Sequence, residues 1–196
     1  MKISRRQFFS FLVSLPIIGL VSSAFLRKSP DLLEPTPPCD DHDEPTPAQT
    51  EGPYFTPNSP ARSSLREQGK TGTLLVLTGR VVNTKCEPVA KALLDWWHAD
   101  DAGQYDNEGF NYRGHQYTDA KGYFRLETIV PGNYPGRTRH FHVKVQAPNK
   151  PVLTTQLYFP DEPQNKKDFI FKPALLMKTA KANAKIKAAY TFVLKA

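Results

Sequence analysis

The amino-acid sequence predicts an all-β fold, a single β-sandwich built from mostly antiparallel strands. Short runs of β-favouring residues recur along the chain at roughly ten-residue spacing, separated by Gly, Pro, Asn and Asp turns. The chain also contains 18 prolines, which is typical of a protein with many turns. With 196 residues it is long enough for one well-buried domain and too short for two comfortable ones.

Alternating apolar residues and turn signals place the individual strands. The expected strands are residues 74–82, 90–98, 113–118, 123–129, 140–145 and 153–159. In the second of these, Ala92, Leu94 and Trp96 fall on one face, because side chains alternate along a strand. Residues 178–189 are rich in Ala and Lys, which favours a solvated helix before a final strand near residues 190–194.

The charge distribution argues against a nucleic-acid-binding protein. The formal net charge is +7, but positive residues gather in the first 28 residues and in the tail from Lys166 onward. No stripe of Lys and Arg interleaved with aromatic residues runs through the centre of the chain. We therefore expect no nucleic-acid partner.

Residues 1–28 have the pattern of an export signal. The pair Arg5-Arg6 precedes an apolar run over residues 8–26, as in twin-arginine signals, and small residues before the end of the run fit cleavage after Ala24. An ordinary signal peptide and an uncleaved membrane anchor remain alternatives. The expected partner is the twin-arginine export machinery of a bacterium, and the expected location is periplasmic or anchored outside the cytoplasmic membrane.

The next segment has the composition of a linker. Residues 29–48 are rich in proline and acidic residues, which predicts little structure of their own. We expect the folded domain to span residues 49–196.

Two histidines, His140 and His142, lie two positions apart in a β-favouring run. On a strand their imidazoles leave the same face, while Phe141, Val143 and Val145 leave the other face and can pack into a core. Two adjacent imidazoles make half of a metal site. The residues alone leave open whether this pair is a metal site or a packed pair of side chains.

The nearby oxygen ligands are phenols rather than carboxylates. No Glu or Asp lies at a ligand spacing from His142, and neither cysteine is expected at the end of a neighbouring strand. Tyr134 lies just upstream across a Pro-Gly turn, and Tyr105 follows another turn. Two phenolates suit a hard trivalent cation, because anionic oxygen stabilises high charge and tyrosinate is an established iron ligand.

A longer series of spaced residues surrounds these tyrosines and histidines. In chain order it comprises Leu77, Gly79, Val81, Cys86, Pro88, Val89, Ala92, Asp95, Trp96, Trp97, Gly103, Tyr105, Asp119, Gly122, Phe124, Pro131, Gly132, Tyr134, Arg137, His140, His142, Thr155 and Gln156. This series resembles the signature of the intradiol ring-cleavage dioxygenases, the family that includes catechol 1,2-dioxygenase and protocatechuate 3,4-dioxygenase. The resemblance covers about residues 50–160.

The resemblance implies a mononuclear non-haem Fe(III) centre in a β-sandwich. The matching ligands are Tyr105, Tyr134, His140 and His142. It further implies an enzyme that uses O2 to cleave a catecholic ring between its two hydroxylated carbons and yields a muconate-type diacid. Tyr134 would leave the metal when the catechol binds and would then act as a base.

Further roles follow from the same resemblance. Arg137 matches an arginine that stabilises negative charge developing on the ring, and Gln156 matches a pocket residue that orients a hydroxide or a substrate oxygen. The residues matching the family's substrate-pocket segment are Thr50, Gly52, Pro53 and Tyr54. If the protein is exported, a disulfide between Cys39 and Cys86 would fix the linker to the sandwich.

Several features depart from the family pattern. The loop from Tyr134 to Arg137 is short, and a signal and linker stand where the catechol enzymes have a helical dimerisation region. The identity of the catechol and the formation of a homo-oligomer are therefore open. Two rival hypotheses are a non-catalytic transthyretin-like or carboxypeptidase-associated binding module, and a zinc or copper hydrolase, which would need a carboxylate ligand.

Overall fold

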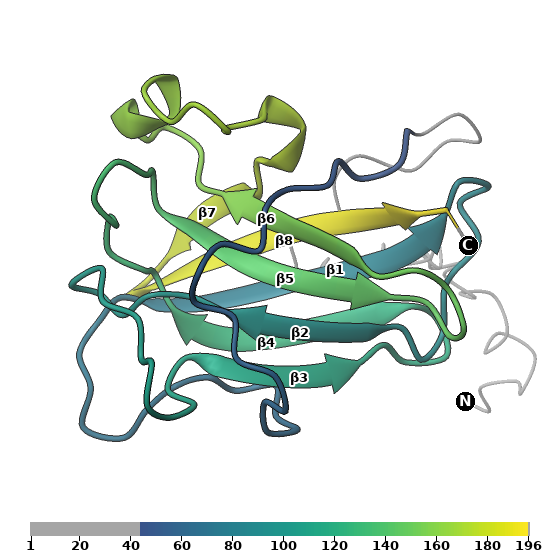
Figure 1. Cartoon of the computed structure of the whole chain (residues 1–196), viewed down its shortest axis with the longest axis horizontal. Helices are drawn as coiled ribbons and strands as arrows, with labels where there is room; N and C mark the ends of the chain where they lie inside the picture. Colours follow the sequence, from purple (N-terminus) through teal and green to yellow (C-terminus); the bar gives the residue numbers. More distant parts are fainter. Residues whose placement is uncertain (1–43, 196) are drawn as a thin grey trace, which may run out of the picture. The chain divides into compact units, whose positions relative to one another are not determined.

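The computed structural model describes residues 44–195, which form two stacked four-stranded sheets (Figure 1). The strands are β1 (Leu74–Asn83), β2 (Leu93–Trp97), β3 (Arg113–Tyr117), β4 (Tyr123–Ile129), β5 (His140–Gln146), β6 (Leu153–Tyr158), β7 (Lys178–Ala182) and β8 (Lys185–Leu194). Two short 3₁₀ helices, η1 (Pro163–Lys166) and η2 (Pro173–Leu175), follow β6. The predicted all-β sandwich is confirmed.

One sheet has the strand order β4-β1-β8-β7 and the other has the order β3-β2-β5-β6. Every strand pair in the two sheets is antiparallel except β1 and β8, which run parallel in register from the Leu74–Lys185 pair to the Asn83–Leu194 pair. The prediction of mostly antiparallel strands therefore also holds.

The core lies between the two sheets and is built mainly from alternate residues of β1, β2, β4, β5 and β8. Leu75 and Leu77 of β1 are fully buried, and so are Phe141, Val143 and Val145 of β5. Because side chains alternate along β5, His140 and His142 point away from this core to the outer face of their sheet. The predicted orientation of the two imidazoles is confirmed.

The predicted helix over residues 178–189 is wrong. This segment forms β7 and the first half of β8, joined by a tight turn in which Asn183 has a φ of 54°. Ala188 and Ala189 are buried between β1 and β7, so tertiary packing overrides the helical preference of alanine. The lysines of β7 lie on a sheet edge, where charged side chains discourage pairing with other chains.

A strap made of residues 44–65 crosses the outer face of the β3-β2-β5-β6 sheet, seen in dark blue in Figure 1. Its anchors include hydrogen bonds from Gln49 N to Thr154 O (2.9 Å) and from Ser59 Oγ to Asp95 Oδ1 (2.7 Å), and a backbone bridge between Ala61 and His115. The strap thus covers the face from which the two histidines project.

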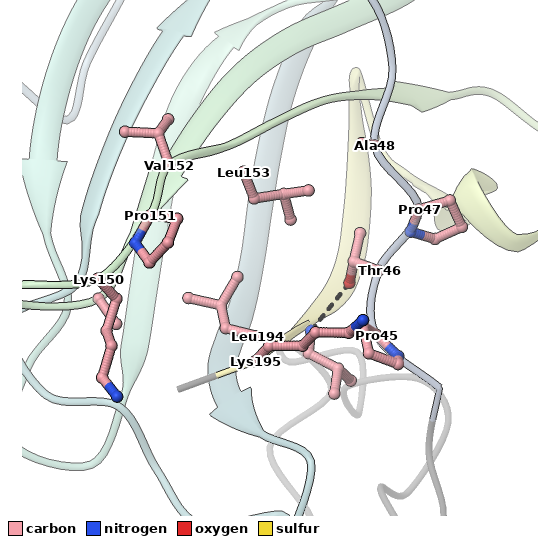
Figure 2. Close-up of a pocket in the computed structure, with 12 residues that line it drawn as sticks. Pro45, Thr46, Pro47, Ala48, Lys150, Pro151, Val152, Leu153, Leu194 and Lys195 are labelled. Atoms are coloured by element: carbon pink, nitrogen blue, oxygen red, sulfur yellow. Dashed lines mark hydrogen bonds between the residues drawn. The ribbon is translucent and has the colours of Figure 1, made fainter.

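A groove of about 480 Å³ lies at the far end of this sheet, beside the turn that joins β5 to β6 (Figure 2). Its wall is formed mainly by prolines and aliphatic residues: Pro45, Pro47, Pro151, Val152, Leu153 and Leu194. None of the residues predicted for the functional site lines this groove.

Within residues 44–195, no helix is long and apolar enough to span a membrane. The predicted signal segment, most of the predicted linker and Cys39 lie outside the described residues. The twin-arginine signal, the domain bounds and the Cys39–Cys86 disulfide therefore stay predictions.

Candidate metal centre

His140 and His142 bring two ring nitrogens to one point. Their Nε2 atoms are 3.0 Å apart, and both side chains are buried. His140 Nδ1 lies 2.7 Å from the carbonyl oxygen of Thr138. Because a carbonyl only accepts, Nδ1 carries the proton and Nε2 of His140 presents a lone pair.

Both imidazoles are neutral near pH 7. Burial lowers the pKa of His140 to about 4, and burial together with the neighbouring His140 lowers the pKa of His142 well below its ordinary value. Trp97 covers the ring of His142 in a stacked contact with centroids 4.8 Å apart. A neutral, fixed imidazole is the form that binds a metal.

Tyr105 approaches the histidine pair from the loop between β2 and β3. Its hydroxyl is 3.4 Å from His140 Nε2, and its ring meets that of His142 edge-on at 6.1 Å. Burial raises the pKa of Tyr105, while the positive charges of Arg137 and Arg113 oppose that rise. A phenolate at this position therefore needs a nearby cation.

Two loops with the same Gly-x-Tyr spacing pack against each other and bring Tyr105 and Tyr134 together. A Cβ on Gly132 would lie 2.4 Å from Gly103 N, and one on Gly103 would lie 2.3 Å from Asn133 O. Only glycine allows this close approach of two backbones. As a result, the two tyrosine rings meet edge-on with centroids 6.0 Å apart.

Tyr54 of the strap contacts both of these tyrosines. Its hydroxyl is 2.8 Å from that of Tyr134, and its ring stacks on Tyr105 with centroids 4.4 Å apart. Gly52 also reaches the site, because a Cβ there would lie 3.5 Å from His142 Cε1. Pro53 between them is exposed to solvent.

Arg137 and Gln156 lie beside the histidine pair. Arg137 Nη2 donates to Gln156 Oε1 at 2.6 Å, and Gln156 is the register partner of His142 across β5 and β6. Gln156 Nε2 donates to the carbonyl oxygen of Thr50 at 2.9 Å. The predicted site residues of the described range thus gather in one region, with Thr50 contributing its backbone rather than its side chain.

Two buried charged residues at this site were missed by sequence reasoning. Arg113 donates to the carbonyl oxygens of Tyr54 and Asp106, both at 2.6 Å, and so joins the strap to the loop of Tyr105. Asp168 accepts a hydrogen bond from Arg137 Nε at 2.8 Å. Neither residue follows a sequence pattern, because their partners are backbone atoms or residues distant in the chain.

The donor set fits a hard trivalent cation. It comprises two neutral ring nitrogens, of His140 and His142, and two phenol oxygens, of Tyr105 and Tyr134. Two nitrogens bound at ~2.1 Å to one ion and about 90° apart would be ~3.0 Å from each other, which matches the observed separation. No group of three or more His, Cys, Asp or Glu suited to a metal occurs among residues 44–195, so phenol oxygen is the anionic ligand at hand.

The fold and this donor set agree with what the resemblance to the intradiol ring-cleavage dioxygenases implies. A family model described as Dioxygenase matches residues 50–196, and the chain belongs to this family.

The relatives are named as dioxygenases of several kinds. The dioxygenase domain of a dioxygenase–carbohydrate-binding protein fusion from Streptomyces sp. SirexAA-E is 55% identical, with a TM-score of 0.76 over 77% of this chain and 98% of that one. The 3-chlorocatechol 1,2-dioxygenase of Rhodococcus opacus 1CP is 30% identical, with a TM-score of 0.69 over 76% of this chain and 71% of that one. Catechol 1,2-dioxygenase 2 of Acinetobacter lwoffii is 30% identical over 64% of this chain and 55% of its own length. The chain spans about half the length of the curated relatives it matches.

Gly132→Ala should separate the two tyrosine loops and weaken metal binding, because the added Cβ has no room beside Gly103. We expect the iron content after loading to fall severalfold while the β-sheet circular dichroism is retained. Asn133→Ala, at the next position, is the control, since the side chain of Asn133 is exposed and the substitution keeps the backbone that contacts Gly103. Equal iron content in both variants would contradict the role assigned to the glycine contact.

The metal-free protein should lose stability as the pH falls from about 6.5 toward 4. His98 is fully buried between Ala99 O and Thr128 Oγ1, and burial lowers its pKa to about 4. Between the unfolded value of ~6.5 and the folded value, only the unfolded state binds the proton, so stability is complete above that window and declines within it. The contribution of His98 is about 3 kcal/mol.

Urea unfolding of the metal-free protein at several pH values measures this loss. The slope of the unfolding free energy against pH gives the number of protons taken up on unfolding. His98→Gln should lower that number by about one between pH 4 and 6.5. The same pH dependence in His98→Gln and in the unsubstituted protein would show that His98 does not titrate in this window.

Proposed function

We propose that the protein is an Fe(III)-dependent intradiol dioxygenase that cleaves a catecholic ring between its two hydroxylated carbons, using O2 and yielding a muconate-type diacid. The observation that carries the proposal is the convergence of two neutral imidazoles and two phenols beside Arg137, whose side chain is 14% exposed. Family membership and relatives named as catechol and hydroxyquinol 1,2-dioxygenases support it.

Tyr105, Tyr134, His140 and His142 would hold the ferric ion. When bound, Fe(III) would take both catechol oxygens as ligands and withdraw electron density from the ring, which prepares the substrate for O2. The two imidazoles supply neutral nitrogen, and the two tyrosinates balance most of the charge of the ion.

Tyr134 is suited to accept a proton from a hydroxyl group of the catechol. Its oxygen lies in a half-buried loop and already has a partner, the hydroxyl of Tyr54 at 2.8 Å. That hydroxyl can donate to the tyrosinate of Tyr134, or accept from the phenol once the proton has moved. The hydroxyl of Tyr105 lies 3.4 Å from His140 Nε2, and we assign Tyr105 a fixed position.

Arg137 supplies positive charge beside the site. Its guanidinium stabilises the negative charge that develops on the ring during oxygenation. Gln156, held by the Thr50 carbonyl and by Arg137, orients an oxygen of the substrate or of a hydroxide. The strap covers this face and limits the entry of water, which strengthens both electrostatic contributions.

The non-catalytic binding module is the weaker hypothesis. A module of that kind gains nothing from burying His142, whose Nδ1 has no hydrogen-bond partner among residues 44–195, because desolvated polar groups are costly unless they find a partner. The match of the family model over residues 50–196 also favours the enzyme.

We further propose that the protein is exported through the twin-arginine pathway and that Cys39 pairs with Cys86 outside the cytoplasm. The support is the Arg5-Arg6 pattern and the presence of two cysteines in the chain. Replacing both arginines by lysine should leave the protein in the cytoplasm, as measured by cell fractionation. Mass spectrometry of the periplasmic protein should show a Cys39–Cys86 cross-link, and two free thiols there would reject the pairing.

Tyr105→Phe should remove most of the colour and activity of the iron-loaded protein. Charge transfer from tyrosinate to Fe(III) gives a broad visible band, and the loss of one phenolate should weaken both the band and iron binding, with kcat/KM for catechol falling ~10²-fold or more. Absorption spectra, metal analysis and product identification by mass measure the three effects.

Tyr123→Phe is the matched control. Tyr123 is 43% exposed on β4 and its ring contacts Arg80, far from the histidine pair. This variant should keep its colour and its turnover. Equal losses in both variants would mean that the ligands are misassigned, and a colourless, inactive unsubstituted protein after iron loading would contradict the proposed function itself.

A further inference from the structure

Asp168 is a fully buried carboxylate in the segment between η1 and η2. The exposed fraction of its side chain is 0%, and that of its partner Arg137 is 14%. Oδ2 accepts from Arg137 Nε at 2.8 Å and from Thr138 N at 3.0 Å, while Oδ1 accepts from Ile170 N at 3.1 Å. A buried carboxylate is stable only when it is paired in this way.

Asp168 fixes one edge of the Arg137 guanidinium. Nε bonds to Asp168, and Nη2 bonds to Gln156 Oε1 at 2.6 Å and lies 3.4 Å from the hydroxyl of Tyr158. Among residues 44–195, Nη1 has no hydrogen-bond partner. The guanidinium is planar, so fixing Nε and Nη2 also fixes the direction of the two Nη1 protons.

The segment that carries Asp168 is itself tied to the strap. Gln49 Nε2 donates to Ile170 O at 2.8 Å. The hydroxyl of Tyr158 lies 2.9 Å from Gln156 Oε1 and 3.2 Å from Gln49 Oε1, and its single proton can be donated to either oxygen. These contacts close a ring of hydrogen bonds around Arg137. Asp168 is the one carboxylate in this ring, so it supplies the counter-charge as well as the orientation.

We propose that Asp168 is a positioning residue for the ring-cleavage reaction: it holds the Arg137 guanidinium so that Nη1 remains free to act on the substrate. The inference rests on the proposed function, because it assigns Asp168 a role that is exerted through Arg137. Asp168 does not itself touch the substrate or the metal ligands.

The test compares Asp168→Asn with the unsubstituted iron-loaded enzyme, using catechol as the probe. Asparagine can keep an oxygen toward Arg137 and Thr138 N but removes the charge and faces Ile170 N with a donor. We expect kcat to fall ~10- to 100-fold, since misplacement of a charge-stabilising group costs about that much, and KM to change by less than about threefold. The visible charge-transfer band should persist, which shows that the iron ligands are in place.

Glu162→Gln is the matched control. Glu162 lies just before η1 and pairs with Arg139, the second residue after Arg137, at 3.2 Å, and both side chains are partly exposed. This variant removes a neighbouring ion pair of the same type and should leave kcat unchanged. An equal loss of kcat in Glu162→Gln would show that any disturbance of this region suffices and would overturn the proposal.

A double substitution distinguishes a positioning role of Asp168 from a role in folding. In Arg137→Gln, adding Asp168→Asn should cause no further loss of kcat and should raise the melting temperature, because it removes a buried charge without a partner. A further loss of kcat would mean that Asp168 acts independently of Arg137. If Asp168→Asn alone does not fold, Asp168→Glu, which keeps the charge but moves the oxygens by one methylene, should show the same fall in kcat with the band retained.

The outcomes distinguish the two proposals. An unsubstituted protein without colour or turnover would remove the proposed function. A coloured, active protein whose Asp168→Asn variant keeps its full kcat would overturn only the role of Asp168.

Discussion

The site depends on the placement of two Nε2 atoms 3.0 Å apart in a dry environment. Strand periodicity puts His140 and His142 on one face of the sheet. Pairing of β5 with β2 and β6 fixes the register of the two histidines within that sheet. The carbonyl oxygen of Thr138 sets the tautomer of His140, and burial keeps both rings uncharged. Nδ1 of His142 has no hydrogen-bond partner among residues 44–195, so its tautomer is not fixed, and Nε2 of His142 can either donate to His140 or bind a cation.

The other parts of the site are brought to this point from separate segments. Gly103 and Gly132 allow two loops to pack backbone to backbone, and each presents a tyrosine two residues later. Arg113 joins one of these loops to the strap through carbonyl oxygens. The sandwich can support this construction on its outer face because the core occupies the opposite face of the same sheet.

Local patterns predicted much of the fold, and the family resemblance named the candidate ligands. Strand β4 has the predicted bounds, residues 123–129, because alternation and a flanking Asp-x-x-Gly turn are both local signals. The prediction failed for residues 178–189, where alanine and lysine favour a helix in isolation but the space between β1 and β7 favours small residues on a strand. Alanine composition alone does not reveal which neighbours a segment will have.

The charged residues behind the ligands were beyond sequence reasoning for a different reason. Asp168 lies 31 positions after its partner Arg137, in a segment without regular structure, and nothing in the spacing indicates their contact. Arg113 bonds to backbone carbonyls, which every residue possesses, so no residue type marks its partners. Such long-range contacts depend on how the strap, the loops and the sheet are arranged in space (Figure 1).

We propose that one ferric ion is shared by Tyr105, Tyr134, His140 and His142. Anomalous diffraction from a crystal of the iron-loaded protein, recorded at the iron absorption edge, locates the ion. We expect a single peak within bonding distance of both Nε2 atoms and both phenol oxygens. A peak at other residues, or no peak among these four side chains in a protein that retains its fold, would contradict it.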